Sequence, residues 1–444
     1  MLRFGTDGIR GNADADLTPD LVVALGRAAA VVFGVDQPFI VGRDTRQSGP
    51  RLRDNLAAGL HAEGAVVRDA GVLPTPGLAF LASAAQCPAL MISASHNPWT
   101  DNGIKLFANG GRKLDDATER RVEEELLARA GHGMAPPAGA AIDSEPNAPY
   151  LAHLVGAIAG RRLDGLKVAL DCANGAASEL GPAAFRALGA DVVVVHAAPD
   201  GTNINTACGS TDPSDLQAAV VAAGADAGFA FDGDADRVLA VDARGVSVDG
   251  DQIMVIAALD LRERGLLRND AIAVTVYSNL GLHHALQPAG IGVVETPVGD
   301  RQVMAAIEAH DLVLGGEQSG HVIFRDLATT GDGVLTGLLL LDRMKRSGRS
   351  LADLAAAMTR VPQLLENVTV ASRPDLESAP ELTAEIAAVA AELGNDGRVF
   401  VRASGTEPMI RIMVEAPTAE GARAALARIR QATEQAFGAA GPGR

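Results

Sequence analysis

The strongest constraint on the fold is a plan of strands and helices that the chain repeats three times. In each copy, an apolar strand precedes a helix-compatible segment that ends at a glycine, which is expected to open a second strand. The first strands are predicted at residues 39–42, 167–170 and 271–274, and the second at residues 64–67, 189–193 and 290–294. Strands separated by helices indicate parallel βαβ units with right-handed crossovers.

A third apolar strand closes each copy and leads into a polar loop. This step occurs at residues 89–92 before Ser95, at residues 228–231 before Asp232, and at residues 311–314 before Glu317. Ligands bind at the carboxyl ends of strands in such sheets, so the loops are expected to share one cleft. The predicted fold class is α/β, with three similar mixed-sheet βαβ domains and a smaller C-terminal α+β domain around a central cleft. Taken alone, the repeat has an alternative explanation, which is that strands of α/β proteins resemble one another by chance.

Length and composition suggest where these domains begin and end. A chain of 444 residues is too long for one core and should divide into domains of about 100–150 residues. Gly, Ala and Pro make residues 131–150 a linker candidate, and composition shifts again at residues 359–372. We expect four domains. Residues 1–150 carry the Ser95 loop, residues 151–250 the Asp232 loop and residues 251–366 the Glu317 loop. Residues 367–444 form the C-terminal domain, with a strand–loop–strand at 398–415 and a helix at 418–437.

Charge, cysteine content and hydropathy limit the class of protein. The formal net charge of −17 argues against nucleic acid or a membrane as the main partner, so an anionic substrate needs a local cationic cluster. Cys87, Cys172 and Cys208 are an odd number without metal-ligand spacing, which favours reduced thiols. No secretory signal is visible, and the apolar run at residues 334–341 is shorter than the ~20 residues that span a bilayer. We therefore expect a cytoplasmic protein.

The loop at residues 92–98 is a candidate for nucleophilic chemistry. Pro98 ends any regular element, so the Ser95 hydroxyl is expected on a tight loop rather than in a core. A serine next to His96 is common in loops and is weak evidence alone. It gains weight from the carboxylate and arginine loops found elsewhere in the chain, because the three together point to phosphoryl transfer.

Three carboxylates, Asp232, Asp234 and Asp236, stand at alternate positions directly after the apolar strand at residues 228–231. Carboxylates without His or Cys select a hard cation, Mg²⁺ or Ca²⁺, over zinc. An EF-hand is excluded because Arg237 stands where that loop requires glycine. An acidic β-turn is the structural alternative.

Two further loops offer groups for a phosphosugar. Arg402, Ser404, Gly405, Thr406 and Arg411 combine guanidiniums, hydroxyls and a close backbone approach, as a phosphate site requires. A polar hairpin with surface arginines is the alternative. Glu317 and Ser319 could bind neighbouring hydroxyls together, although a polar loop flanked by glycines is weak evidence. Lys105 and Arg10 each follow a glycine turn and, taken singly, are better read as surface charges.

Together these motifs resemble the α-D-phosphohexomutase superfamily. The resemblance runs in order from residues 4–11 to residues 402–411 and covers nearly the whole chain. Residues 3–8, 296–301 and 329–333, with Gln318 in the Glu317 loop, are most similar to the bacterial phosphoglucosamine mutases of that superfamily. Trp99, where a smaller aromatic is more familiar, is the one departure and should be harmless.

The resemblance implies a role for each motif. Ser95 would carry a phosphoryl group, and one Mg²⁺ would be held by Asp232, Asp234, Asp236 and a phosphoserine oxygen. Arg10, Lys105, Arg237 and His321 would line the reacting end, with His96 beside them on the substrate. Glu317 and Ser319 would bind the sugar, and the non-reacting phosphate would be held by Arg402, Ser404, Gly405, Thr406 and Arg411.

The implied reaction interconverts glucosamine 6-phosphate and glucosamine 1-phosphate, toward UDP-N-acetylglucosamine, through glucosamine 1,6-bisphosphate as intermediate and activator. The implied partners are the phosphosugar, an activating kinase or bisphosphate donor for Ser95, and a possible homodimer mate. Phosphomannomutase/phosphoglucomutase activity with the same mechanism is the nearest alternative. A phosphatase or phosphotransferase using Asp232 as nucleophile, and a phosphosugar-sensing binding protein, stay open as well.

Overall fold

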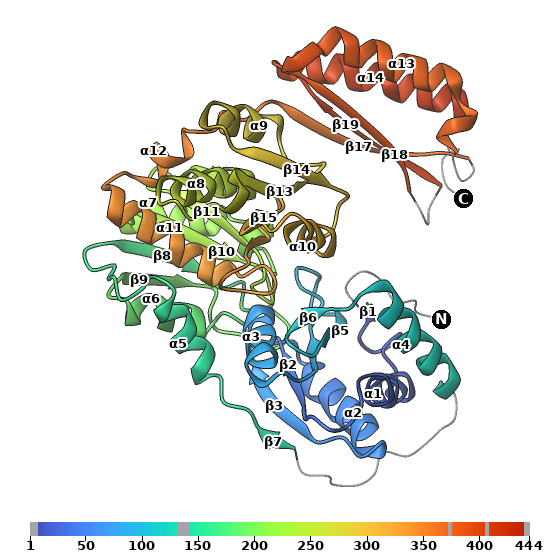
Figure 1. Cartoon of the computed structure of the whole chain (residues 1–444), viewed down its shortest axis with the longest axis vertical. Helices are drawn as coiled ribbons and strands as arrows, with labels where there is room; N and C mark the ends of the chain where they lie inside the picture. Colours follow the sequence, from blue (N-terminus) through green and yellow to red (C-terminus); the bar gives the residue numbers. More distant parts are fainter. Residues whose placement is uncertain (1–7, 131–141, 372–374, 405–407, 439–444) are drawn as a thin grey trace. The chain divides into compact units, whose positions relative to one another are not determined.

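The computed structural model describes residues 8–130, 142–371, 375–404 and 408–438. The chain forms two compact units (Figure 1). The first unit comprises residues 1–276 and 291–357, and the second comprises residues 277–290 and 358–444.

The first sheet of the first unit has seven strands among the described residues, in the order β1-β5-β4-β2-β3-β7, with β6 paired to β5. Its strands are β1 (Ile9–Asn12), β2 (Phe39–Arg43), β3 (Val67–Val72), β4 (Ala89–Ile92), β5 (Asp101–Ala108), β6 (Arg112–Lys113) and β7 (Asp143–Ser144). Its helices are α1 (Pro19–Phe33), α2 (Gly49–Ala62), α3 (Thr75–Ala85) and α4 (Asp116–Arg129). Leu25, Leu56 and Val122 bring α1, α2 and α4 into one core with the sheet.

Two smaller sheets complete the first unit, in the orders β12-β11-β10-β8-β9 and β14-β13-β15-β16. The strands of the second sheet are β8 (Lys167–Asp171), β9 (Asp191–Val195), β10 (Ala227–Phe231), β11 (Val238–Asp242) and β12 (Ser247–Val248). The accompanying helices are α5 (Ala148–Gly156), α6 (Leu180–Ala187), the 3₁₀ turn η1 (Gly209–Thr211) and α7 (Ser214–Ala223).

The third sheet contains β13 (Ala271–Thr275), β14 (Gly292–Thr296), β15 (Leu314–Gly316) and β16 (Val322–Phe324). Its helices are α8 (Gly250–Glu263) and α10 (Asp300–Ala309), whereas α11 (Gly333–Ser347) packs on β10 and β11 of the second sheet, and α12 (Leu351–Ala355) packs on α8 and β11.

The three sheets share one design. In each, a first strand pairs in parallel with its two successors, and the strand after the polar loop returns antiparallel, as β4–β5, β10–β11 and β15–β16. The loop therefore lies between a parallel strand and its antiparallel neighbour in every copy. The predicted α/β fold class with mixed sheets is confirmed.

The second strands begin later than the sequence predicts. Gly64, Gly189 and Gly290 have φ of 87°, 93° and 64°, a left-handed conformation that ends a helix and does not open a strand. β3, β9 and β14 begin two or three residues further on. The predicted linker at residues 131–150 also contains structure, since β7 pairs with β3 and α5 begins at Ala148. Residues 131–141 lie outside the described part of the chain.

The second unit is a three-stranded antiparallel sheet in the order β17-β19-β18, with α13 and α14 on one face (Figure 1). Its elements are α9 (Leu280–Leu286), β17 (Gln363–Thr369), α13 (Pro380–Leu393), β18 (Arg398–Ala403), β19 (Met409–Glu415) and α14 (Ala419–Phe437). Ile412, Leu382 and Ile429 join the sheet and both long helices in one core. The smaller α+β domain is thus confirmed. Across the described residues of both units, no helix combines the length and apolarity that crossing a membrane requires.

Candidate active site

Three buried carboxylates lie on the loop between β10 and β11. Asp232, Asp234 and Asp236 each place an oxygen within 4.8 Å of the others. The loop bends at Ala235, whose φ of 56° is left-handed. The structure therefore gathers the three predicted metal ligands, which we call the carboxylate triad, at the carboxyl end of β10.

The triad fits a hard divalent cation. Oδ1 of Asp234 and Oδ1 of Asp236 are buried, and neither has a hydrogen-bond partner within the described residues. A buried acceptor without a donor is costly, and a cation satisfies it. Burial, with Asp236 and Asp234 nearby, raises the pKa of Asp232, and a divalent cation would favour its ionised form again. The all-oxygen donor set matches Mg²⁺.

Ser95 reaches this triad from the loop after β4. The side chain is buried, and the backbone is left-handed, with a φ of 53°. The Ser95 hydroxyl donates to Oδ2 of Asp232 at 2.6 Å, and Nδ1 of His96 lies 3.3 Å from the same hydroxyl. The predicted nucleophile thus contacts a predicted metal ligand that is 137 residues away in the chain.

A buried arginine holds the Ser95 loop in place. The Arg46 guanidinium donates to the carbonyl oxygens of Ser95 and Asn97, both at 2.9 Å, and to that of Pro98 at 2.6 Å. Its Nε is paired with Asp44 at 2.9 Å, and both side chains are fully buried. One side chain therefore fixes the backbone at three positions on and after Ser95.

Asp44 supports Ser95 from a second direction. It accepts a 2.6 Å hydrogen bond from Ser93 Oγ, which itself accepts the Ser95 amide at 2.9 Å. Burial raises the pKa of Asp44 despite the attraction of Arg46. The Asn205 amide also donates to the Ser95 carbonyl at 2.8 Å. Sequence reasoning missed these residues, although Asp44 directly follows β2 and so lies at the same sheet edge as Ser95.

Cationic side chains surround the pair of Ser95 and Asp232. Lys105, on β5, is buried and donates to Oδ2 of Asp234 at 2.6 Å. Burial lowers the pKa of His96, and the charges of Arg237 and Arg10 lower it further. Both predicted arginines are therefore close enough to His96 to act on its charge. Such surroundings favour an anionic substrate.

His321 packs against the triad from the loop before β16. Its Nδ1 lies 3.8 Å from Oδ1 of Asp236, and the Gly331 amide donates to its Nε2 at 3.0 Å. Burial lowers the pKa of His321, but Asp236, Asp300 and Glu317 outweigh burial and raise it. Protonation of both nitrogens is nevertheless incompatible with the Gly331 bond, which needs a lone pair on Nε2. The geometry decides for a neutral ring with its proton on Nδ1, facing Asp236.

Glu317 and Ser319 lie on the loop between β15 and β16, and their side chains are in contact. Ser319 Oγ donates to Oε2 of Glu317 at 3.4 Å, while Oε1 accepts the Gly299 amide at 3.1 Å. Gly320 has a φ of 94°, and a Cβ there would overlap the Val238 carbonyl oxygen. The Val238 amide donates to the Gly320 carbonyl at 3.1 Å. The loop predicted to bind sugar is thus fastened to the strand that follows the triad.

The first residues of two helices also brace the triad. Thr75, at the start of α3, donates from its amide to the Asp234 carbonyl at 2.9 Å and from its hydroxyl to Oδ2 at 2.5 Å. The Gly333 amide donates to the Ala235 carbonyl at 3.0 Å. Sequence reasoning missed Thr75 as a site residue, because its polar partner comes from a distant part of the chain.

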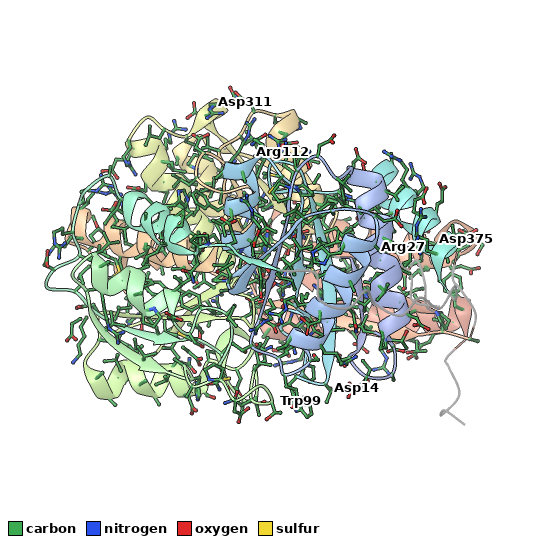
Figure 2. All side chains as sticks on the ribbon, turned by 90° about the horizontal axis from the view of Figure 1, so that it is seen from below. Asp14, Arg27, Trp99, Arg112, Asp311 and Asp375 are labelled. Carbon is green, nitrogen blue, oxygen red and sulfur yellow. The ribbon has the colours of Figure 1, made fainter. Side chains whose placement is uncertain are left out.

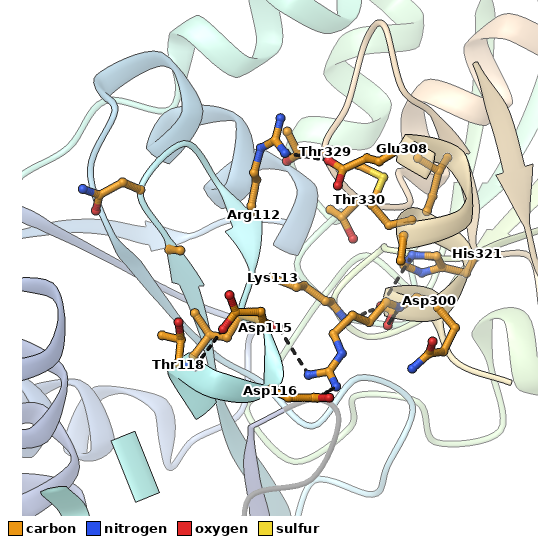
Figure 3. Close-up of a pocket in the computed structure, with 18 residues that line it drawn as sticks. Arg112, Lys113, Asp115, Asp116, Thr118, Asp300, Glu308, His321, Thr329 and Thr330 are labelled. Carbon is orange, nitrogen blue, oxygen red and sulfur yellow. Dashed lines mark hydrogen bonds and ion pairs between the residues drawn. The ribbon is translucent and has the colours of Figure 1, made fainter. Parts of the chain in front are cut away.

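A charged groove of about 520 Å³ begins beside His321 and runs between α10 and the segment from β6 to α4 (Figure 3). Lys113 is paired with Asp300 inside it. Arg301 is paired with Asp116 and, at 2.8 Å, with Glu119. These ion pairs connect the first and third sheets of the first unit. The half-buried Trp99, near the edge of the view in Figure 2, takes no part in them.

The predicted phosphate loop belongs to the second unit. Arg402 and Arg411 are direct partners across β18 and β19, a position where like charges repel. Nε of each is buried without a hydrogen-bond partner among the described residues. Ser404 beside them is 7% exposed. An anion bound by both guanidiniums would offset their repulsion. Gly405 and Thr406 lie outside the described residues.

The chain matches all four domains of one protein family. Models of the phosphoglucomutase/phosphomannomutase family match over domain I, domain II, domain III and the C-terminal domain, at residues 1–130, 148–245, 249–361 and 365–432.

Relatives match over nearly the full length. The phosphoglucosamine mutase of Salinispora tropica is 51% identical over 439 residues, covering 96% of this chain and 97% of that protein. The phosphoglucosamine mutase of Mycolicibacterium paratuberculosis is 50% identical over 441 residues, covering 98% and 99%.

Solved structures show the same fold. A phosphoglucomutase/phosphomannomutase family protein from Burkholderia thailandensis superposes with a TM-score of 0.81 at 25% identity, covering 98% of this chain and 97% of that one. The Aspergillus fumigatus N-acetylphosphoglucosamine mutase, solved with GlcNAc-6P and magnesium, superposes with a TM-score of 0.71 at 20% identity, covering 98% and 96%. From its domain matches and its full-length relatives, this chain belongs to the phosphoglucomutase/phosphomannomutase family of the α-D-phosphohexomutase superfamily.

Proposed function

We propose that this chain is a phosphoglucosamine mutase, an isomerase that interconverts glucosamine 6-phosphate and glucosamine 1-phosphate. The observation that carries the proposal is the buried Ser95 hydroxyl, held 2.6 Å from Asp232 in an all-oxygen triad. Identity of about 50% to phosphoglucosamine mutases over nearly the whole chain supports the choice of substrate.

In the proposed cycle, phosphorylated Ser95 gives its phosphoryl group to the free sugar hydroxyl and forms glucosamine 1,6-bisphosphate. The intermediate reorients, and its other phosphate returns to Ser95. Mg²⁺ held by Asp232, Asp234, Asp236 and a phosphoserine oxygen would neutralise charge on the transferring group. The first phosphoryl group would come from a kinase or a bisphosphate donor.

In this proposal, the cationic side chains neutralise the charge on the transferring phosphoryl group that Mg²⁺ does not neutralise. Arg10, Lys105 and Arg237 would balance the phosphoryl charge. His96, whose Nδ1 lies 3.3 Å from the Ser95 hydroxyl, and His321 are the candidate proton carriers. A general acid or base contributes only about 10²–10⁴-fold, so charge neutralisation and positioning contribute more to the rate. Glu317 and Ser319 would hold sugar hydroxyls, and the phosphate that is not transferred would be bound by Arg402, Ser404, Gly405, Thr406 and Arg411.

The direct test compares kcat/KM for glucosamine 6-phosphate, glucose 6-phosphate and mannose 6-phosphate in Mg²⁺, with Ser95→Ala as the control. We expect a strong preference for the amino sugar and no turnover by the variant. A preference for glucose or mannose would make the chain a phosphoglucomutase/phosphomannomutase with the same mechanism. No turnover of any of them would favour a phosphosugar-binding protein.

A labelling experiment separates the two candidate nucleophiles. Incubation with a ³²P-labelled sugar bisphosphate should leave an acid-stable label on Ser95, and Ser95→Ala should abolish it. A base- and hydroxylamine-sensitive label that survives in Ser95→Ala would assign the nucleophile to Asp232 and overturn the serine cycle.

A further inference from the structure

A second group of metal-ligating side chains lies apart from the carboxylate triad, at the carboxyl ends of β8 and β9. Asp171 is the last residue of β8, His196 follows β9, and Cys208 precedes η1. One ligand atom from each lies within 4.8 Å of the other two. Asp171 and Cys208 are fully buried, whereas the His196 side chain is 25% exposed. We call these three residues the Asp-His-Cys cluster.

The cluster is already arranged at the spacing of a tetrahedral metal site. Nδ1 of His196 lies 3.1 Å from Oδ2 of Asp171, and two nitrogen or oxygen ligands of tetrahedral zinc are roughly 3.3 Å apart. The amides of Ala173 and Gly209, both at 2.9 Å, hold the Asp171 carboxylate in place. Little rearrangement would therefore be needed to bring the donors onto one ion.

The other ring nitrogen of His196 has the partner that metal-bound histidines usually have. Nε2 lies 3.1 Å from Oδ2 of Asp215, an exposed carboxylate on α7. Such a carboxylate accepts a hydrogen bond from Nε2–H and so leaves the Nδ1 lone pair to face the metal. Here that lone pair faces the Asp171 oxygen, an unfavourable contact unless a cation or a second proton lies between them. Without an ion, a ring with its proton on Nδ1 donates to the buried Asp171 and leaves Nε2 to the exposed Asp215 and solvent. With an ion on Nδ1, Nε2–H donates to Asp215, so the ion lets both carboxylates be satisfied.

The donor chemistry distinguishes this cluster from the triad. One oxygen, one nitrogen and one sulfur ligand suit a borderline cation such as Zn²⁺ or Co²⁺, whereas an all-oxygen set suits Mg²⁺. Because Asp171 and Cys208 are both fully buried, an ion would reach the cluster from the side of the partly exposed His196. We propose that Asp171, His196 and Cys208 bind one zinc-type divalent cation, at a metal site additional to the carboxylate triad. Binding replaces the thiol S–H by a metal–sulfur bond and releases that proton to solvent.

The segment between His196 and Cys208 links the Asp-His-Cys cluster to the Ser95 loop. That segment carries Asn205, whose amide nitrogen donates to the Ala173 carbonyl at 3.0 Å and whose side chain donates to the Ser95 carbonyl at 2.8 Å. Gly209 lies against the Phe231 carbonyl at the end of β10, where a Cβ would come within 2.5 Å of that oxygen. An ion in the cluster would therefore restrain one support of Ser95.

The test uses the full-length chain, stripped with a chelator, saturated with Mg²⁺ and then titrated with Co²⁺. We expect one equivalent of Co²⁺ with a thiolate-to-cobalt charge-transfer band that Zn²⁺ displaces. Cys208→Ala should abolish the band, and Asp215→Asn should weaken Co²⁺ binding about 10–100-fold. Cys87→Ala, which removes a buried thiol between α3 and β4, is the matched control and should titrate like the parent.

Three results would overturn the proposal. They are no thiolate band in the parent chain, a band that persists in Cys208→Ala, and Co²⁺ uptake that is lost in Asp234→Asn instead. A metal-free ring whose Nδ1–H donates to Asp171 predicts the first of these results. Because Asp215 is exposed on α7, Asp215→Asn should fold normally. The test therefore stays decisive even if Cys208→Ala fails to fold. Circular dichroism of each metal-free variant checks this.

Discussion

The geometry of Ser95 is set by side chains that flank its backbone more than by the serine itself. Arg46 alone donates to the carbonyls of Ser95, Asn97 and Pro98, and Asp44 reaches the Ser95 amide through Ser93. A phosphoryl acceptor must be aligned closely with its donor, and a displacement of about 1 Å can cost about 10²-fold in rate.

Arg46→Lys tests this positioning. Lysine keeps the charge beside Asp44 but cannot present a guanidinium fork to three carbonyl oxygens. We expect kcat to fall about 10²-fold while KM for the sugar phosphate changes little. Steady-state kinetics give the two constants, and Arg51→Lys, a partly exposed arginine on α2, is the control. A raised KM with unchanged kcat would show that Arg46 acts on substrate binding instead.

The relative cost of losing Asp234 and His321 tests whether charge neutralisation outweighs proton transfer. Asp234→Asn removes a carboxylate whose Oδ1 is buried without a hydrogen bond among the described residues, so we expect the larger loss of kcat/KM. His321→Asn removes one proton carrier, a contribution of at most about 10²–10⁴-fold. Parallel assays at saturating Mg²⁺ decide, and the reverse order would refute the mechanism proposed above.

At this scale, the sequence predicts best where a polar loop follows an apolar strand. Ser95 and Asp232 were found in that way, and the structure joins them. Asp44 directly follows β2 and Asp171 is the last residue of β8, so extending the rule to the ends of the first strands would have found both. Arg46 and Thr75 could not be found, because their partners are backbone carbonyls and a carboxylate that only folding brings near.

Among the elements, α11 begins with a buried acid. Asp332 caps the helix by accepting the Leu335 amide at 2.9 Å, and the Tyr150 hydroxyl donates to its other oxygen at 2.9 Å. Burial raises the pKa of Asp332 to about 6, even though both hydrogen bonds favour the ionised form. Relative to the unfolded chain, the folded state is therefore more stable when this acid is protonated.

Stability should therefore depend on pH through Asp332. The pKa in the folded chain lies above the ordinary value of 3.8, so the contribution is complete below about pH 4 and is lost as pH rises through 6. The loss is at most about 3 kcal/mol. We expect the thermal midpoint of the parent to fall relative to that of Asp332→Asn between pH 4.5 and 7. Parallel pH profiles would contradict this, and Tyr150→Phe controls for the lost hydroxyl contact.

Element boundaries show where local sequence stops being informative. Thr418 was expected to open the last helix, and its hydroxyl does accept the Gly421 amide at 3.0 Å. The second strands were misplaced because glycine after a helix serves the helix end, a distinction that depends on a φ value and not on hydropathy. β7 was missed because a two-residue strand exists only through its pairing with β3.

For the whole molecule, the division into two units predicts how Mg²⁺ affects unfolding. The carboxylate triad lies entirely in the first unit, and the second unit has a core of its own. A ligand at 100 times its Kd stabilises the state that binds it by about 2.7 kcal/mol. We expect calorimetry to show two transitions, of which only one rises with Mg²⁺, and Asp234→Asn to abolish that rise. A single transition, or two that rise together, would contradict this.

The composition of the second unit could not be read from the sequence. Residues 277–290 interrupt the third sheet, yet they belong with the C-terminal strands. Asn279 exchanges hydrogen bonds of 2.9 Å with the Val361 backbone, and the Arg398 side chain donates to the Ser278 carbonyl at 2.6 Å. These partners are more than 80 residues apart, and no periodic pattern marks them.

This interleaving has a consequence for biosynthesis. On the ribosome, the segment that carries α9 is made long before β17, β18 and β19, the strands of the unit to which it belongs. It must stay unpaired while the remainder of the third sheet is completed around its two ends. The first unit can therefore mature during translation, whereas the second can close only after β19 has left the exit tunnel. Nascent chains stalled between α11 and β19 should expose α9 to proteases and chaperones.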